Sequence, residues 1–273
     1  MGHLQYTRDF MSDNKMQQAL TESTCLDLVK KVYWSGTCLF GLENNDKNTL
    51  WHLLENCTSN KGTKFPDFID DHGFIEHFQI SSSKTTKKGQ EHTRQLNQFK
   101  KQDEDIIKNL NREEIDIHKP VEMANITNIM KYPEHSYEYL LESLKSTWNK
   151  HLNSLNNYKG PNSIKVFMVQ YNDIGALQMY ENYPNEIEGI FIGDFPKHKP
   201  INYRFTRDNY ILDYLYKYNQ IIDYAIFISY NKYVEIIKIS NIPKLKKMNP
   251  FTYTIASTCS PMIQSSFTYS KNT

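Results

Sequence analysis

The sequence predicts an α/β protein in which a mixed β-sheet carries helices on its faces. Three observations support this fold class. Residues 163–171 (SIKVFMVQY) form an apolar run that is typical of a buried strand. Residues 64–69 and 74–80 form two aromatic and β-branched runs separated by a turn, which predicts a hairpin. Residues 138–155 carry apolar side chains at helical spacing, so an amphipathic helix is expected to cover the strands.

The composition argues against several classes of protein. With 39% hydrophobic and 13% aromatic residues, the chain of 273 residues can build a core, so it is not disordered throughout. Its 32 basic and 31 acidic residues give a net charge of +1, which argues against a uniformly basic nucleic-acid coat protein. No transmembrane run and no secretory signal are visible, so we expect a cytoplasmic protein that does not contact a membrane.

Several common functional motifs are missing from the sequence. We find no GxGxxG or GxxxxGK[ST] phosphate loop, no GxSxG nucleophile elbow and no HExxH metalloprotease motif. The cysteines have neither CxxC spacing nor a zinc-finger arrangement with histidine, so we expect reduced and mostly buried thiols. They are Cys25, Cys38, Cys57 and Cys259.

The predicted domain organisation has three parts. A polar and flexible N-terminal arm covers residues 1–15, a single α/β domain covers residues 16–242, and a basic, then Ser/Thr-rich tail covers residues 243–273. Within the domain, residues 84–119 are rich in Lys, Gln, Glu and Asp, which predicts a polar and partly helical insert. The other expected elements are a helix from Leu20 to Tyr33, a helix from Thr49 to Cys57, a helix capped by Thr206 or Asp208 and ending at Asn219, and strands at 188–193, 223–230 and 233–240.

The predicted hairpin contains two carboxylates. If the middle two residues of segment 70–73 (DDHG) form its turn, Phe68 lies opposite Ile75 and Asp67 lies opposite Glu76. Directly opposed residues share one face of the sheet, with Cβ atoms about 4.5–5.5 Å apart. Two carboxylates at this distance repel each other unless a proton or a cation lies between them. Mg²⁺ binds carboxylate oxygens, so the pattern indicates a metal-dependent phosphodiesterase.

A family resemblance rests on these residues. A short helix bearing Glu55, then Pro66-Asp67 on one strand and Glu76 on the next, resembles the PD-(D/E)xK nuclease superfamily over about residues 49–83. The resemblance implies a restriction-endonuclease-like αβββαβ core, which the following helix and strand would complete. It also implies Asp67 and Glu76 as catalytic and metal-binding carboxylates, Glu55 as an added metal ligand, Mg²⁺ or Mn²⁺ as cofactor, and DNA as substrate. A homodimer and a setting in bacterial or phage defence or counter-defence are further implications.

The sequence departs from the superfamily pattern at one position. The superfamily has a lysine two residues after the glutamate, where this chain has Phe78. Gln79 is the polar candidate for the catalytic role of that lysine, although strand alternation places it on one face with His77. An alternative register would bring both to the active face. A lysine from elsewhere in the chain is the other alternative: Lys84, Lys87, Lys88, Lys145 or Lys150.

Each candidate residue also has a structural alternative. Asp67 and Glu76 could bind metal, could belong to a buried hydrogen-bond network, or could be exposed on a surface hairpin. The hairpin is apolar on both faces, which argues against exposure. Glu55 could be an ordinary surface residue of its helix, and His77 a core histidine.

A basic segment follows the hairpin. Residues 84–101 hold six basic residues and one acidic residue, and hydroxyl side chains precede them, so the segment could hold a nucleic-acid backbone. The alternative is a solvated loop. The candidate nucleic-acid-binding residues are Lys84, Lys87, Lys88, Arg94, Lys100 and Lys101. The sequence therefore predicts a metal-dependent nuclease acting on DNA. The alternative is a catalytically inactive module of the same fold that binds nucleic acid or protein.

Overall fold

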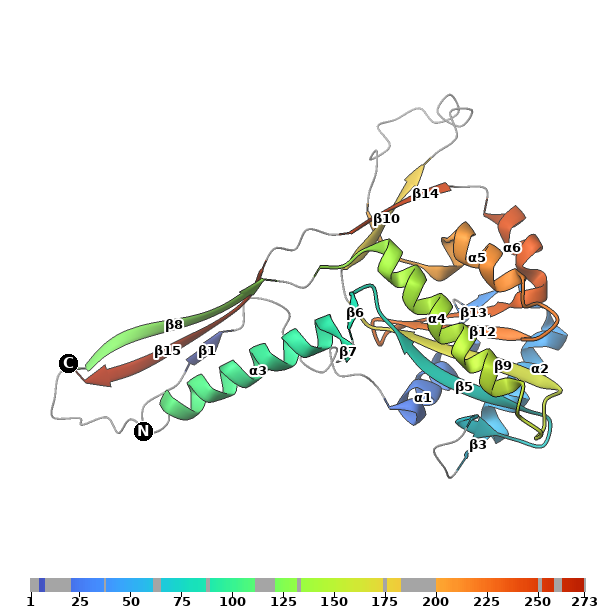
Figure 1. Ribbon diagram of the computed structural model, residues 1–273, viewed down its shortest axis with the longest axis horizontal. Coiled ribbons are helices and arrows are strands. Elements are labelled where there is room, and N and C mark those ends of the chain that lie inside the picture. The colour runs from blue at the N-terminus through green and yellow to red at the C-terminus, as the bar shows by residue number, and fades with distance from the viewer. Residues whose placement is uncertain are drawn as a thin grey trace. The chain divides into compact units, whose positions relative to one another are not determined.

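The computed structural model describes most of the chain in two compact units (Figure 1). The described residues are 5–7, 21–36, 38–60, 65–86, 89–110, 121–131, 134–173, 176–182, 200–249, 252–257 and 262–272. Unit 1 combines Met1–Met16, Ser83–His135 and Cys259–Thr273, and unit 2 combines Gln17–Ser82 and Ser136–Thr258. Unit 2 is an α/β structure with a mixed sheet and flanking helices, so the predicted fold class is confirmed at this level.

The main sheet of unit 2 has seven strands in the order β2-β13-β12-β9-β5-β4-β3. The central strands β5, β9 and β12 run parallel to one another. Strands β3, β4 and β5 form an antiparallel meander, and β12 and β13 form an antiparallel hairpin. The strands are β2 (Leu39–Phe40), β3 (Thr58–Ser59), β4 (Phe68–Ile69), β5 (Gly73–Ile80), β9 (Ile164–Tyr171), β12 (Tyr224–Ser229) and β13 (Tyr233–Lys238).

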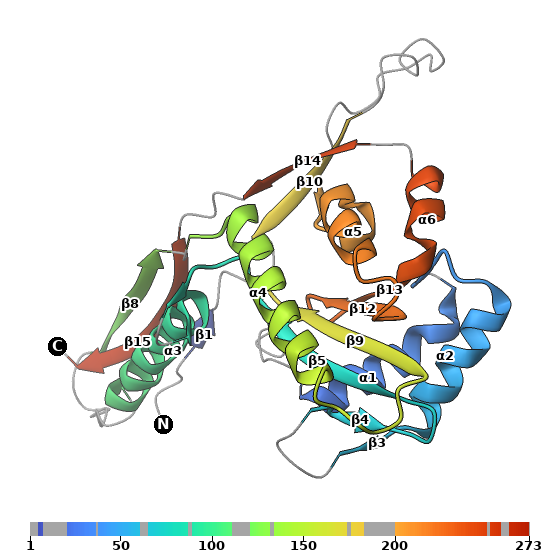
Figure 2. The same cartoon turned by 45° about the vertical axis from the view of Figure 1, so that its right-hand side comes forward.

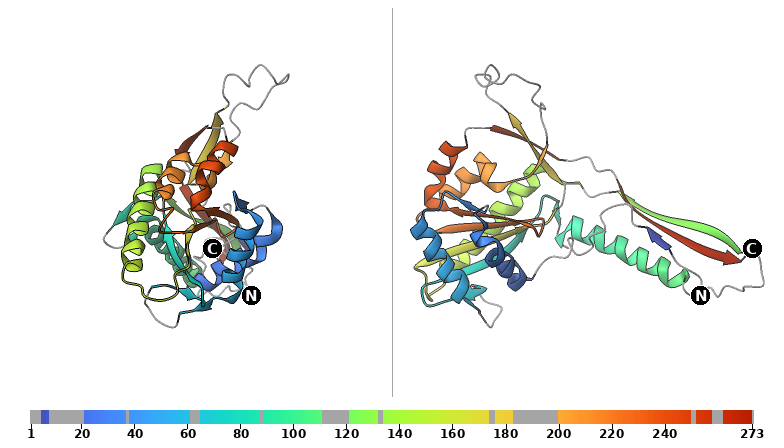
Figure 3. Two further views of the ribbon diagram at one scale, coloured as in Figure 1. Left: turned by 90° about the vertical axis from the view of Figure 1, so that its right-hand side faces the viewer. Right: turned by 180° about the vertical axis from the view of Figure 1, so that it is seen from behind.

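Helices cover both faces of this sheet, as Figures 2 and 3 show. One face carries α4, α5 and α6, and buries Trp148 of α4 against Phe78 of β5. The other face carries α1 and α2, and buries Leu53 of α2 in the same cluster as Ile75 of β5. The helices are α1 (Glu22–Val32), α2 (Asn44–Asn56), α4 (Tyr137–Leu155), α5 (Asn209–Tyr216) and α6 (Ile242–Met248), with short 3-10 turns η1 (Tyr33–Ser35), η2 (Phe205–Arg207) and η3 (Ile239–Asn241).

Local sequence explains where these helices begin. The Ser136 side chain caps α4 by accepting a hydrogen bond from the Tyr139 N–H. Asp208, one of the two predicted caps of α5, accepts hydrogen bonds from the N–H groups of Tyr210 and Ile211. Each cap satisfies backbone donors that a helix leaves unpaired at its first turn. The chain therefore enters α4 and α5 at defined residues, and the apolar stripes of both helices face the sheet.

The C-terminal segment 243–273, predicted as a basic and then Ser/Thr-rich tail, contains regular secondary structure. It contains most of α6, then β14 (Thr252–Ser257) in a small sheet of unit 2, and then β15 (Met262–Asn272) in unit 1. The small sheet has the order β11-β10-β14, with β10 (Leu177–Asn182) and β11 (Ile201–Asn202). Pairing with strands that are distant in sequence stabilises both segments as strands. The strand expected at 188–193 lies outside the described residues.

Unit 1 is an αβ element built from the insert and both ends of the chain. Its three-stranded sheet has the order β1-β15-β8, so part of the predicted N-terminal arm is a strand. Asp103 of α3 accepts hydrogen bonds from Asn128 of β8 and Ser265 of β15, which hold the helix on the sheet. The elements are β1 (Gln5–Thr7), β6 (Thr85–Thr86), β7 (Gly89–Gln90), α3 (Glu91–Leu110), β8 (Val121–Lys131) and β15. The predicted partly helical character of the insert is confirmed by α3.

Two smaller expectations can be compared with the structure. Cys25, Cys38 and Cys57 are buried free thiols, as predicted, and Cys259 lies outside the described residues. Across the described helices, none has both the length and the apolar character that crossing a membrane requires.

Candidate functional site

The β4–β5 hairpin brings Asp67 and Glu76 together in the predicted register. Phe68 pairs with Ile75 in the ladder, which places Asp67 opposite Glu76. The Asp67 N–H donates to Glu76 Oε2 over 3.2 Å, and the His77 N–H donates to Asp67 Oδ2 over 2.6 Å. The two carboxyl groups therefore lie side by side at the start of β4, on the sheet face covered by α4.

Helix α4 supplies a third polar group to this pair. His151 Nδ1 lies 2.6 Å from Glu76 Oε1, and the imidazole stacks on the Phe78 ring with centroids 4.6 Å apart. Glu76 is only 5% exposed, so the alternative of a fully solvated carboxylate is wrong for this residue. The contact fixes the His151 ring between the carboxylate and an aromatic face. We call Asp67, Glu76 and His151 the hairpin carboxylate site.

Burial shifts the protonation of Asp67. The pKa of Asp67 is raised from an ordinary value of 3.8 to about 6, first by burial and then by the negative charge of Glu76 and a carboxyl–carboxyl hydrogen bond. The His77 N–H and the His151 ring act in the opposite direction. An anionic Asp67 therefore lacks enough positive charge around it, which is the condition that a bound cation would relieve.

A second acidic residue responds to the same charge. The pKa of Glu22, in the first turn of α1, is raised by burial and then by the negative charge of Asp67. Glu22 is exposed, so its carboxylate can reorient. Sequence reasoning missed both Glu22 and His151, because no local pattern links either residue to a hairpin so distant along the chain.

Gln79 does not belong to the hairpin carboxylate site. Its Nε2 donates to Gln170 Oε1 of β9 over 2.8 Å, and Gln170 in turn donates to Asn231. Strand alternation places Gln79 and His77 on the face opposite Glu76, so the alternative register does not occur and the predicted catalytic role of Gln79 is not supported. His77 is buried there, and burial lowers its pKa to about 4, so it stays neutral near pH 7.

Glu55 is also separated from the carboxylate pair. It is exposed on α2, whose buried residues join the core on the other face of the sheet from Glu76. The amphipathic pattern of α2 turns Leu53 and Leu54 inward and leaves Glu55 outward. The predicted metal-ligand role of Glu55 therefore has no support in the geometry.

The position of the superfamily lysine is occupied by a buried ring. Phe78 is 5% exposed and packs against Trp148 and His151. On α4, Lys145 donates to the Tyr210 hydroxyl over 2.7 Å and lies above that ring, whereas Lys150 is exposed. The α4 residue that does reach the carboxylates is His151.

The predicted nucleic-acid-binding residues belong to unit 1. Lys84 precedes β6, and Arg94, Lys100 and Lys101 lie on α3. Lys84, Arg94 and Lys101 are exposed, and Lys100 is half-buried. Lys87 and Lys88 lie outside the described residues. Exposed basic residues therefore lie in unit 1, some of them on a helix that also carries Glu91, Asp103, Glu104 and Asp105, while the hairpin carboxylate site belongs to unit 2.

The donor chemistry of the hairpin carboxylate site suits a hard divalent cation. Asp67 and Glu76 offer carboxylate oxygens, and water would fill the remaining positions, as Mg²⁺ prefers. The raised pKa of Asp67 also fits, because a cation would stabilise the anionic form. Among the described residues, no three carboxylate, imidazole or thiol groups are already arranged to hold a metal ion. A cation would therefore have to be held by two protein carboxylates and solvent.

Comparisons with protein-family models, curated proteins and solved structures each returned no match to this chain.

Proposed function

We propose that this chain is a metal-dependent nuclease that hydrolyses phosphodiester bonds in DNA. Asp67 and Glu76 would hold Mg²⁺ or Mn²⁺. The observation that carries the proposal is the pair itself: two carboxyl groups from neighbouring strands, one of them with its pKa raised to about 6 by burial and by the other. A bound divalent cation would supply charge to the phosphate oxygens and lower the pKa of a bound water.

The order of elements supports this proposal. Within unit 2, helix α2, strands β3, β4 and β5, helix α4 and strand β9 occur in the αβββαβ order of a restriction-endonuclease-like core, with the unit 1 elements β6, β7, α3 and β8 inserted between β5 and α4. Asp67 precedes the second of these strands and Glu76 lies on the third. These are the positions that the PD-(D/E)xK resemblance assigns to the metal-binding carboxylates.

His151 is the proposed substitute for the missing lysine. Glu76 engages its Nδ1, which leaves Nε2 as the nitrogen that can exchange a proton with water. Stacking on Phe78 fixes the plane of the ring. His151 would thus orient a water molecule or take its proton, while Glu76 holds the imidazole in one orientation.

DNA cleavage tests the proposal directly. Circular duplex DNA and single-stranded DNA would be incubated with Mg²⁺ or Mn²⁺ and with wild type, Asp67→Asn, Glu76→Gln or His151→Gln. We expect metal-dependent cleavage in wild type and at least a hundredfold loss in the carboxylate variants. Asp71→Asn is the matched control, because Asp71 is an exposed carboxylate of the same hairpin. Equal cleavage by wild type and both carboxylate variants would contradict the proposal.

One observation favours a second candidate function. Both carboxylates already have partners within the protein, and Phe78 occupies the lysine position. The same fold could therefore serve as an inactive DNA-binding module through the exposed basic residues of unit 1. Retention of DNA without cleavage under either metal would select this candidate and would reject the nuclease proposal.

A further inference from the structure

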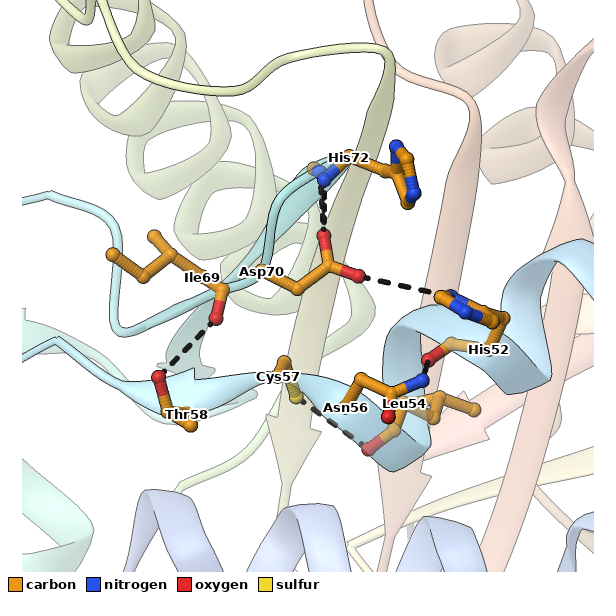
Figure 4. Close-up of polar contacts among 9 residues, drawn as sticks. His52, Leu54, Asn56, Cys57, Thr58, Ile69, Asp70 and His72 are labelled. Atoms are coloured by element: carbon orange, nitrogen blue, oxygen red, sulfur yellow. Dashed lines mark hydrogen bonds and ion pairs between the residues drawn. The ribbon is translucent and has the colours of Figure 1, made fainter.

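We propose that His52, Asp70 and His72 form a site for one transition-metal ion such as Zn²⁺, separate from the hairpin carboxylate site. His52 lies on α2, and Asp70 and His72 lie in the turn between β4 and β5. Figure 4 shows the two imidazole rings on the same side of the Asp70 carboxylate. We call these three residues the turn histidine site.

Asp70 provides a fixed carboxylate with one oxygen to spare. Its Oδ1 accepts hydrogen bonds from the N–H groups of His72 and Gly73, each over 2.7 Å, which locks the side chain. Its Oδ2 is buried, and among the described residues it has no hydrogen-bond partner. The Asp70 side chain is only 5% exposed. A buried carboxylate oxygen without a hydrogen bond is costly, and a positively charged ion bound to it would offset that cost.

His52 and His72 supply nitrogen ligands that would hold a metal ion beside this oxygen. His52 Nδ1 lies 3.9 Å from Asp70 Oδ2, and the ring centroids of His52 and His72 lie 5.7 Å apart. Donors on a tetrahedral Zn²⁺ lie about 2.0–2.2 Å from the ion, so two donors are separated by about 3.4 Å. As they stand, the three groups are not arranged to hold an ion. The His52 side chain is 60% exposed and His72 is also exposed, so both rings have room to rotate toward Asp70 Oδ2 when an ion binds.

The donor set favours Zn²⁺ over Mg²⁺. Imidazole nitrogen is a preferred ligand of Zn²⁺, Ni²⁺ and Co²⁺, whereas Mg²⁺ prefers oxygen. Cys57 lies close by (Figure 4), but its thiol is directed to the Leu54 carbonyl, and burial raises its pKa to about 11. We therefore assign two histidines and one carboxylate as the protein ligands, with water in the remaining position. The ion would clamp the end of α2 to the hairpin turn.

Metal titration of the full chain tests this site. Zn²⁺ binding would be measured by calorimetry, and Co²⁺ binding by its visible absorption, both with Mg²⁺ in excess. We expect one ion per chain, and at least a tenfold loss of affinity in His52→Gln, in His72→Gln and in Asp70→Asn. The Asp70→Asn variant keeps the Oδ1 atom that accepts hydrogen bonds from the His72 and Gly73 N–H groups. The matched control is His92→Gln, since His92 belongs to unit 1.

Two experimental outcomes would contradict the proposal that the turn histidine site binds a metal ion. The first is absence of stoichiometric binding by a wild-type chain that melts cooperatively. The second is unchanged affinity in both histidine variants. Asp67→Asn separates this proposal from the nuclease proposal, because it removes a carboxylate of the other site and should leave Zn²⁺ binding intact.

Discussion

At the residue scale, Asp67 links protonation to stability. Its pKa is raised to about 6, mainly by burial, so folding favours the protonated form. This contribution is complete below about pH 4 and is lost as the pH rises through about 6. As the pH rises across this range, we expect the unfolding free energy of Asp67→Asn to increase relative to that of wild type by up to about 2 kcal/mol, a figure reduced for solvent screening because the carboxyl is partly exposed. Denaturant unfolding of both proteins across this range measures the difference.

The control for this prediction is Asp71→Asn, which changes an exposed carboxylate of the same hairpin. Because surface substitutions change stability little, Asp71→Asn should leave the unfolding free energy within about 0.5 kcal/mol of wild type. Saturating Mg²⁺ should raise the stability of wild type at pH 7 and should not raise that of Asp67→Asn, because ligand binding stabilises only the protein that binds it. A pH-independent difference for Asp67→Asn would contradict the charge assignment.

The contribution of His77 to stability depends on pH in the opposite direction from that of Asp67. Burial lowers its pKa to about 4, so folding favours the neutral ring. The stability that this provides is complete above about pH 6.5 and is lost as the pH falls through about 4. We expect His77→Gln to lose less stability than wild type on acidification across this window. Parallel acid-unfolding curves for the two proteins would show that the buried ring is not the source of the effect.

At the element scale, the pairing of β5 with β9 requires glycine at position 73, because glycine has no side chain. A Cβ on Gly73 would clash with the backbone carbonyl oxygen of Ile164, and a backbone atom cannot move aside cheaply. We expect Gly73→Ala to lower the unfolding free energy by about 1–3 kcal/mol or more. Gly36→Ala is the comparison, because Gly36 has a φ of +75° but open space around it. It should cost about 1 kcal/mol, for conformational reasons alone. Equal losses would contradict the steric argument.

The hairpin was predictable because its sequence is locally consistent. The turn composition and the apolar runs both select the register that places Asp67 opposite Glu76, and the structure has this register. Gln79 could also have been excluded from the site by strand alternation alone. His151 could not be identified, because its contact with Glu76 joins residues 75 positions apart. Its helix was predicted, but a helix pattern does not say which strand residue each side chain meets.

The C-terminal strands also depend on contacts between residues that are distant in sequence, so they were even harder to predict. Strand β15 pairs with β8 and β1, and β14 pairs with β10, all distant in sequence. Alternation of polar and apolar residues is short in β14 (TYTIAS) and interrupted in β15 (MIQSSFTYSKN), so the local sequence marks both strands only weakly. Such pairing is decided by the partner strand, and single-sequence reasoning cannot supply the partner.

At the scale of the whole molecule, the two units have separate cores. Both hydrophobic clusters of the main sheet draw their residues from unit 2, whereas Phe99 and Phe267 are buried within unit 1. The chain leaves unit 2 after Ser82 and returns at Ser136, and the Ser136 N–H donates to the Ser82 carbonyl over 2.9 Å. The two ends are therefore hydrogen-bonded neighbours, and a short loop could join them.

This geometry predicts that unit 2 folds without unit 1. A shortened chain would join 17–82 to 136–258 through a short Gly-Ser linker. We expect it to melt cooperatively, because both of its core clusters are complete. We also expect its DNA affinity to fall at least tenfold with a weaker salt dependence, since the basic residues of 84–101 are gone. The matched control is the full chain with Lys84, Arg94, Lys100 and Lys101 changed to Gln, which should lose affinity similarly while keeping unit 1. Full DNA affinity in the shortened chain would show that unit 2 carries the binding surface.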